Sequence, residues 1–353
     1  MSAYDPDQDY RLDPRVRDFL KSFQFGTAAR PDVASRQELL DEVQSPEGVA
    51  VYQMMKQALD AADNEEIAPK AGLVTKQYSL TSAPDGNSIN VQFIRPDDEE
   101  TYPCVYYIHG VGMRTMSCFD GNYRAWGRII TAKGLAVAMV DFRNSIEPSS
   151  VPEVAPFPAG LNDCVSGFHW VRDNAQTLGV DPGQIVIAGE SGGGNLSIAT
   201  TMKLVKEGQG GLVKGLYALC PYIAGIWPLL ENPSSVENEG ILLALHNNHG
   251  AMSYGIEAHD ARDPLAWPGF STEADVAGFP PTMISVNECD PLRDEGVNFY
   301  RLLMRAGITA QCRQVMGTCH GTEIFPSVAP DISHTTASDI KAWVEACCQR
   351  ITR

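Results

Sequence analysis

The residues best suited to chemistry lie in segment 189–193, which reads G-E-S-G-G and places Ser191 at the centre of a G-x-S-x-G pattern. The apolar run 185–188 predicts a buried strand before the pattern, and a helix-forming segment follows it directly. A strand that turns straight into a helix strains its middle residue, and flanking glycines let the two segments approach closely. The serine hydroxyl then lies at a helix N-terminus, where free N–H groups favour negative charge. The pattern predicts a nucleophilic serine; the alternative interpretation is a glycine-rich loop for phosphate.

A serine hydroxyl needs a base to take its proton, and the base needs an acid to orient it. In a fold with this strand–turn–helix pattern, the acid and then the histidine follow the serine on loops after later strands. His320 follows the last predicted strand and is the favoured base; a turn histidine is the alternative. His334, before the last predicted helix, is interpreted as a solvated loop residue. His246 and His249 form an H-x-x-H pair without a third ligand in the sequence, so no metal is expected.

Four acids follow the apolar strand predicted at 281–287. Asp290, directly before Pro291, is the favoured acid, and Glu288, Asp294 and Glu295 are its competitors. Acidic residues favour helix N-termini, which explains Asp294 and Glu295 better than Asp290.

Acyl transfer also needs N–H donors for a developing oxyanion. One source is the N–H of Gly192, directly after the serine, and another is a loop after an earlier strand. The loop after the strand predicted at 104–108 reads H-G-V-G and comprises His109, Gly110, Val111 and Gly112. His109 is interpreted as a structural residue that holds these donors in place.

Strand and helix patterns alternate along most of the chain. Strands are expected at 77–80, 88–94, 104–108, 134–141, 185–188, 215–220, 281–287 and 309–316, and helices at 14–25, 35–62, 123–133, 162–178, after Ser191, at 294–305 and at 335–350. This alternation predicts an α/β fold with a mostly parallel central sheet covered by helices on both faces. Segment 224–267 breaks the rhythm and is interpreted as a cap or lid insertion.

The composition of the chain disfavours several classes of binding partner. The 353 residues carry a formal net charge of −17, which disfavours nucleic acid and anionic membranes. No apolar run is long enough for a transmembrane helix, and the polar N-terminus lacks signal-peptide features. The nine cysteines, without a C-x-x-C pair, are interpreted as reduced thiols, so a cytoplasmic location is expected.

Four motifs together resemble the hormone-sensitive-lipase family of α/β-hydrolases: H-G-V-G at 109–112, G-E-S-G-G at 189–193, D-P-L-R-D-E-G at 290–296 and H-G at 320–321. The likeness runs from about residue 75 to the C-terminus, and it is strongest to a bacterial member with a macrolactone substrate. It implies the α/β-hydrolase fold, a Ser191–Asp290–His320 triad and a helical cap to which residues 1–70 contribute, with 71–353 as the catalytic domain. Val111 departs from the family, which has a glycine there, and Glu190 and Gly192 stand where many members have Asp and Ala.

The resemblance and the motifs together lead to one expected function. We expect a serine carboxylesterase that hydrolyses short- to medium-chain esters of small molecules, with the N–H groups of Val111, Gly112 and Gly192 as the oxyanion hole. No cofactor and no membrane insertion are expected, and a homo-oligomer is left open. Alternatives are a lactone or amide hydrolase, acyl transfer to another alcohol, or a non-catalytic small-molecule receptor on the same fold.

Overall fold

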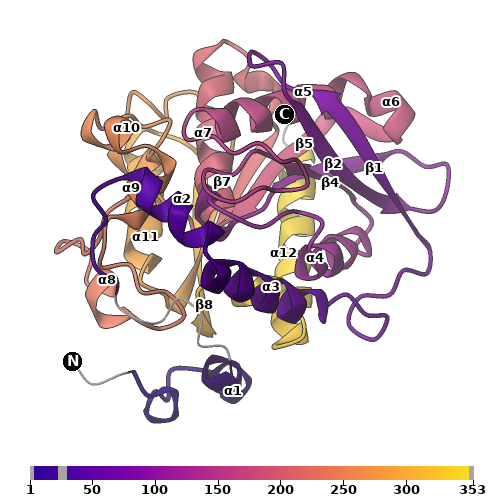
Figure 1. Cartoon of the computed structure of the whole chain (residues 1–353). Coiled ribbons are helices and arrows are strands. Elements are labelled where there is room, and N and C mark those ends of the chain that lie inside the picture. Colours follow the sequence, from indigo (N-terminus) through magenta and orange to yellow (C-terminus); the bar gives the residue numbers. More distant parts are fainter. Residues whose placement is uncertain (1–3, 23–29, 350–353) are drawn as a thin grey trace.

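One eight-stranded sheet organises the fold (Figure 1), in a computed structural model that describes residues 4–22 and 30–349. Its strands lie in the spatial order β1-β2-β4-β3-β5-β6-β7-β8. Their bounds are β1 (Leu73–Thr81), β2 (Ser88–Pro96), β3 (Tyr102–Ile108), β4 (Ala136–Asp141), β5 (Val180–Glu190), β6 (Gly215–Leu219), β7 (Thr282–Cys289) and β8 (Ala310–Cys319). β1 and β2 form an antiparallel hairpin, and β2 joins β4 in the antiparallel sense. All other pairs are parallel, so the predicted mostly parallel sheet is confirmed.

Helices cover both faces of this sheet, as the alternating pattern predicts. Their bounds are α1 (Pro14–Ser22), α2 (Arg36–Gln44), α3 (Pro46–Asp60), α4 (Gly121–Thr131), α5 (Ala159–Asp173), α6 (Ala175–Leu178), α7 (Gly192–Lys206), α8 (Ser234–Glu237), α9 (His249–Tyr254), α10 (Ile256–Asp260), α11 (Arg293–Arg305) and α12 (Pro330–Gln349). Apolar side chains of α5, α7 and α11 pack on one face, and those of α4 and α12 pack on the other.

The central strand β3 shows why both faces are covered. Successive side chains of a strand point to opposite faces. Tyr106 and Ile108 therefore lie in the core beneath α5 and α7, whereas Val105 and Tyr107 lie in the core beneath α4 and α12. All four side chains are fully buried. The loop that follows β3 emerges from a rigid, doubly covered strand, which fixes where its backbone groups lie.

Three helix predictions need correction. The helix expected at 35–62 is two helices, because Ser45 takes an extended conformation before Pro46 and its hydroxyl caps α3 by accepting the Gly48 N–H at 3.0 Å. The helix expected at 162–178 is divided at Asn174 into α5 and α6. His334 is a partly buried residue within α12 rather than a loop residue before it. Residues 23–25 and 350 of the expected terminal helices lie outside the described ranges.

The N-terminal helices lie against the insertion that follows β6 (Figure 1). α2 contacts α9, and α3 contacts α4. Asn248 binds the chain just before α2 twice, accepting the Val33 N–H at 3.0 Å and donating to the Val33 carbonyl at 2.8 Å. The Arg36 guanidinium donates to the Ser145 carbonyl. Two segments more than two hundred residues apart in sequence are thus joined above the sheet.

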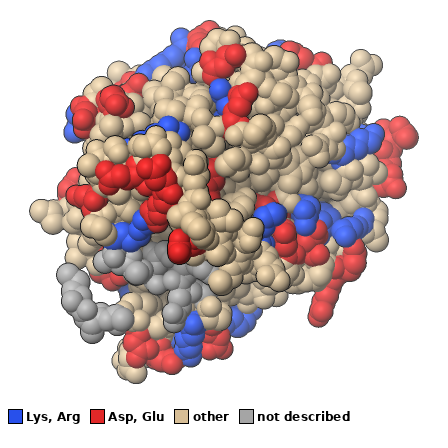
Figure 2. All heavy atoms as spheres, in the orientation of Figure 1, with Lys and Arg blue, Asp and Glu red and all other residues tan. Residues whose placement is uncertain are grey.

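The surface carries charges of both signs. On the face shown in Figure 2, acidic and basic side chains are interspersed rather than separated into large patches. Among the described residues, no helix has the length and apolar character needed to cross a bilayer.

Candidate active site

Ser191 occupies the sharp turn between β5 and α7. Its φ of 57° and ψ of −121° are strained for a residue with a side chain. The Ser191 N–H donates to the Leu219 carbonyl at 3.0 Å, and the Ser191 carbonyl accepts the Tyr222 N–H at 3.0 Å, so the turn is held on both sides. Position 193 accommodates only glycine, because a Cβ there would lie 2.0 Å from the Ile108 carbonyl oxygen. The glycine of the motif is required by close packing of the turn on β3.

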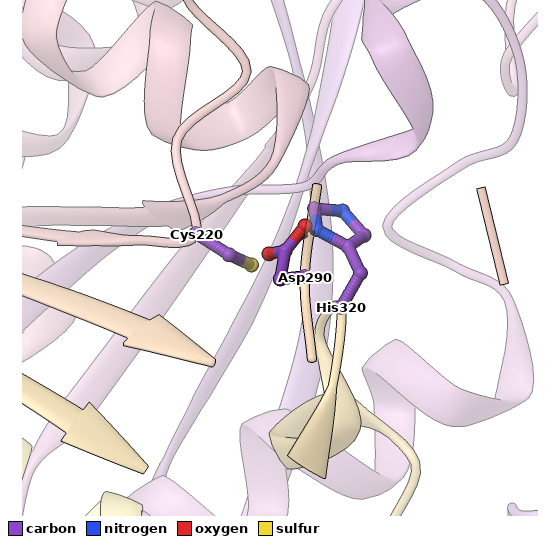
Figure 3. A group of neighbouring side chains, drawn as sticks. All are labelled: Cys220, Asp290 and His320. Atoms are coloured by element: carbon purple, nitrogen blue, oxygen red, sulfur yellow. Dashed lines mark hydrogen bonds and ion pairs between the residues drawn. The ribbon is translucent and has the colours of Figure 1, made fainter. Parts of the chain in front are cut away.

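Asp290 and His320 meet at the ends of neighbouring strands. Asp290 follows β7 and His320 follows β8, and the imidazole Nδ1–H donates to Asp290 Oδ2 at 2.8 Å. The other carboxylate oxygen accepts the Leu292 N–H at 2.8 Å, which fixes the plane of the carboxylate. Figure 3 shows the Asp290 carboxylate lying between the imidazole and the Cys220 sulfur.

The charge of Asp290 sets the basicity of His320. Burial disfavours the charged imidazolium, but the Coulombic attraction and hydrogen bond of Asp290 outweigh it, so the pKa of His320 is raised above its ordinary value. A raised pKa makes the imidazole a stronger proton acceptor, and the Nδ1–H bond leaves Nε2 as the nitrogen that can accept a proton.

Ser191 and His320 line one cavity of about 350 Å³, together with Val111 and Gly112. Asp290 is completely buried behind the imidazole and does not reach the cavity. The three residues proposed from the sequence as nucleophile, base and acid therefore come together from three separate segments. A small molecule entering the cavity meets the hydroxyl and the imidazole but not the carboxylate.

The loop after β3 brings backbone N–H groups to the start of α7. A Cβ on Gly192 would lie 2.8 Å from the Gly112 nitrogen and 2.6 Å from the Met113 nitrogen, so the loop touches the first residue of the helix. The Gly192 N–H has no partner within its helix, because the first N–H groups of any α-helix lack one. Val111 adopts a φ of 60°, which is unfavourable for a β-branched residue. The loop is strained where it borders the cavity.

Glu190 anchors this loop, a role that the sequence did not reveal. One carboxylate oxygen accepts the Gly110 N–H at 2.7 Å and the Tyr123 hydroxyl at 2.6 Å, and the other accepts the Tyr107 hydroxyl at 2.5 Å. Burial raises the pKa of Glu190 to about 7, although these hydrogen bonds lower it. The residue beside the nucleophile therefore ties β3, α4 and the loop to the turn.

His109 is the first residue after β3 and begins the loop. It is fully buried, and its ring stacks on Phe142 with centroids 4.4 Å apart. Burial lowers the pKa of His109 although Asp141 lies 3.7 Å from its Nε2, so the ring is uncharged near neutral pH. His109 does not line the cavity.

The three competing acids have other partners. Glu288 accepts the Gly317 N–H at 2.8 Å, and Asp294 accepts the Ser234 N–H at 2.8 Å. Glu295 is buried and accepts from the Ile223 N–H and the Trp227 indole, both at 2.8 Å. Burial raises the pKa of Glu295 to about 8. Of the four candidates, Asp290 alone is hydrogen-bonded to His320 within the described residues.

The two histidines of the H-x-x-H pair do not bind a common partner. His246 Nε2 lies 2.7 Å from the Ser235 carbonyl and His249 Nε2 lies 2.8 Å from the Pro31 carbonyl, so the two imidazoles serve different segments. Across the described ranges, 4–22 and 30–349, the one cluster of three potential ligands is Cys220, Asp290 and His320. A metal there would take the carboxylate and the Nδ1 that already bind each other. Burial also holds the pKa of the Cys220 thiol well above its ordinary value, which disfavours the thiolate that metals prefer.

The cavity walls come from several parts of the chain. α2 and α3 supply apolar side chains, and the segment before and within α9 supplies further wall residues. Tyr222 and Trp227, in tilted contact with centroids 4.6 Å apart, form part of the wall near the turn. Besides Val111, the other apolar lining residues are Val43, Met55, Leu59, Met116, Ile146, Leu242, Leu243, Ala244, Leu245, Ile324 and Phe325.

Comparisons with known proteins agree with this architecture. A family model described as alpha/beta hydrolase fold matches residues 105–324. The solved structure of esterase Est22 is 59% identical, covers 97% of this chain and 99% of that chain, and superposes with a TM-score of 0.94; another Est22 structure contains p-nitrophenol. Brefeldin A esterase, described as a bacterial homologue of human hormone-sensitive lipase, is 31% identical with a TM-score of 0.83, covering 98% of this chain and 97% of that chain.

A curated relative adds a named activity. Carboxylesterase NlhH of Mycobacterium tuberculosis is 29% identical over 254 residues, which are 71% of this chain and 76% of the relative. With the family model spanning most of the sheet and the Est22 likeness spanning nearly the whole chain, the chain belongs to the α/β-hydrolase-fold family, in the hormone-sensitive-lipase-like group that includes brefeldin A esterase.

Proposed function

We propose that this protein is a serine carboxylesterase that works through an acyl-enzyme intermediate. Ser191 attacks the ester carbonyl while His320 Nε2 takes its proton, and the protonated imidazole then protonates the leaving alkoxide. Asp290 holds the imidazole by its Nδ1–H and stabilises the imidazolium. Water then repeats the sequence on the acyl-enzyme, releasing the acid and restoring the serine.

The oxyanion of the tetrahedral intermediate is stabilised by backbone donors. The N–H groups of Val111, Gly112 and Gly192 supply these donors in our proposal, supported by the close contact between the loop and the first residue of α7. Glu190 and His109 hold the loop in this proposal; Glu190 also lines the cavity, whereas His109 does not.

One observation carries the proposal: His320, hydrogen-bonded to Asp290 at 2.8 Å, opens onto the same cavity as the strained Ser191. The carboxylesterase and esterase names of the relatives support the same reaction class. The cavity of about 350 Å³ with mostly apolar walls suits small esters of short to medium acyl length. We also propose that α2, α3 and segment 224–267 act as a cap, and that the enzyme, whose nine cysteines are mostly buried, works in the cytoplasm.

Covalent labelling of the serine tests the proposal. A fluorophosphonate should modify Ser191 alone, and Ser191→Ala should lose the label and about three or more decades of turnover on p-nitrophenyl acetate and butyrate. Ser338→Ala, which removes an exposed hydroxyl in α12, is the matched control and should behave as the wild type. Retention of near-normal rates by Ser191→Ala would show that another group is the nucleophile.

A panel of substrates distinguishes an ester hydrolase from a lactone hydrolase. Initial rates on an acetate, a butyrate and a macrolactone should rank both simple esters above the ring, because the mostly apolar cavity of about 350 Å³ suits small, flexible esters. A macrolactone hydrolysed faster than both would reverse the assignment of substrate class while leaving the serine mechanism in place.

A further inference from the structure

Among the described residues that line the cavity, one cationic side chain has no partner within the described ranges. Arg114 lines the same cavity as Ser191 and His320 and is partly buried. Its guanidinium forms no hydrogen bond or ion pair with any residue in the described ranges. Arg30, the other arginine that lines the cavity, is paired with Glu42. Arg114 thus offers five N–H donors that nothing in the described part of the protein accepts.

Backbone hydrogen bonds hold Arg114 beside the loop that follows β3. The Arg114 N–H donates to the Val111 carbonyl at 3.1 Å, and the Arg114 carbonyl accepts the N–H groups of Ile146 at 3.2 Å and Glu147 at 2.9 Å. Its aliphatic stem runs beside Gly112: Cδ would lie 3.6 Å from a Cβ at that glycine. The charge is therefore held within one side chain's length of the proposed oxyanion hole.

The charged groups around Arg114 do not neutralise it by contact. Burial lowers the pKa of the guanidinium, with smaller opposing influences from Tyr222, Glu42 and Glu147 and a reinforcing one from Arg30. Burial also raises the pKa of Glu147, the acidic neighbour that shares the cavity wall. By contrast, ion pairs with aspartates raise the pKa of Arg11 and Arg15. An unpaired cation in a partly desolvated cavity is destabilising unless an anion joins it.

We propose that Arg114 is an anion-binding subsite, and that the preferred substrates of this esterase carry a carboxylate as well as the ester. This inference rests on the proposed ester hydrolysis. A guanidinium binds a carboxylate through two parallel N–H···O bonds, which gives both energy and orientation. Since the guanidinium lies beside the loop that cradles the reacting carbonyl, the carboxylate belongs either to the acyl part, as in a dicarboxylic acid half-ester, or to the alcohol part.

Two matched substrate pairs distinguish these sources. Monoethyl glutarate and ethyl 5-methylhexanoate differ on the acyl side, because a carboxylate replaces an isopropyl group of similar shape. Likewise 4-acetoxybenzoate and 4-isopropylphenyl acetate differ on the alcohol side. The measured quantity is the ratio of kcat/KM for the charged ester to that for its neutral counterpart.

Arg114→Met removes the charge and keeps the length of the side chain, and Arg114→Lys keeps the charge without the planar fork. In at least one pair, Arg114→Met should lower the ratio by about tenfold or more, the size of one hydrogen bond to a charged group, and Arg114→Lys should recover part of it. Arg30→Met is the matched control from the same cavity and should leave the ratios unchanged, because Arg30 is already paired.

The outcome separates the two proposals. A ratio that stays within about threefold in both pairs for Arg114→Met overturns the anion subsite, while continued hydrolysis of the neutral esters leaves the esterase in place. If the wild type cleaves none of the four esters, the proposed function itself fails. Thermal melting of each variant confirms that any change in ratio is measured on folded protein.

Discussion

Replacing Asp290 by asparagine tests how much of the activity depends on one buried carboxylate. In the proposed transition state His320 becomes an imidazolium, 2.8 Å from Asp290 Oδ2. At an effective dielectric constant of about 20, two unit charges at that separation attract by about 6 kcal/mol. Since each decade of rate corresponds to about 1.4 kcal/mol, loss of this attraction predicts a fall in kcat of about four decades. An asparagine amide can also donate to Nδ1, which would favour the wrong imidazole tautomer.

The pH profile gives the same experiment a second readout. The base must be neutral, so kcat/KM rises with pH through the pKa of His320. That pKa lies above the ordinary value of 6.5 in the folded protein, and the acidic limb of the wild type should have its midpoint above pH 6.5. Without the carboxylate the pKa falls, and any residual activity of Asp290→Asn should show its acidic limb at lower pH.

Hydrolysis of p-nitrophenyl butyrate from pH 5 to pH 9 measures both effects. Glu288→Gln is the matched control, because Glu288 is a nearby acid whose amide analogue can still accept the Gly317 N–H; it should keep wild-type kcat within about threefold. If Asp290→Asn kept more than about a tenth of wild-type kcat with an unmoved acidic limb, the electrostatic reasoning would be wrong.

Substitutions at two further positions probe the loop beside the cavity. Val111→Gly should raise the free energy of unfolding by up to about 1 kcal/mol. Glycine adopts the observed φ of 60° without the steric penalty of a side chain, and its greater freedom in the unfolded chain offsets part of that gain. A clear drop in stability in urea unfolding would contradict this. Glu190→Ala should lower kcat at least tenfold with little change in KM and destabilise the fold by about 1–3 kcal/mol, because the buried Gly110 N–H loses its acceptor. Glu190→Gln keeps an acceptor and should recover most of kcat, whereas equal losses in the two variants would assign the effect to charge.

The sheet and its order of elements could be predicted because the pattern is local. Apolar runs such as 104–108 and 185–188 are buried on both faces, and each is followed by a turn rich in glycine. The break at Ser45 was not predicted, although the signal is local, since the residue before a proline disfavours helix. Val49 shows the limit of this method: it has helical spacing with Tyr52 and Met55, yet 42% of it is exposed, because the covered side of α3 depends on what packs against it.

The site was less predictable where contacts between residues distant in sequence determine the role of a side chain. Four acids lie between residues 288 and 295, and local sequence cannot say which backbone N–H groups will hold the other three. Glu190 is adjacent to the nucleophile in sequence, but its partners Tyr107, Gly110 and Tyr123 come from two other elements. Arg114 is similar: its lack of a partner among the described residues is a property of the assembled cavity and has no signature in the residues beside it.

The pairing of Asn248 with Val33 has a consequence for recombination between homologues. The cavity wall is shared by α2 and α3 and by the stretch around residue 248, and the pairing between them uses the Asn248 side chain and the Val33 backbone. A transplant of the stretch around residue 248 from a homologue without this asparagine therefore severs the pairing. Chimaeras that exchange both pieces together should inherit the donor's choice of ester while keeping the recipient's chemistry. Substrate preference in such enzymes can therefore change when these two segments, distant in sequence, are inherited together.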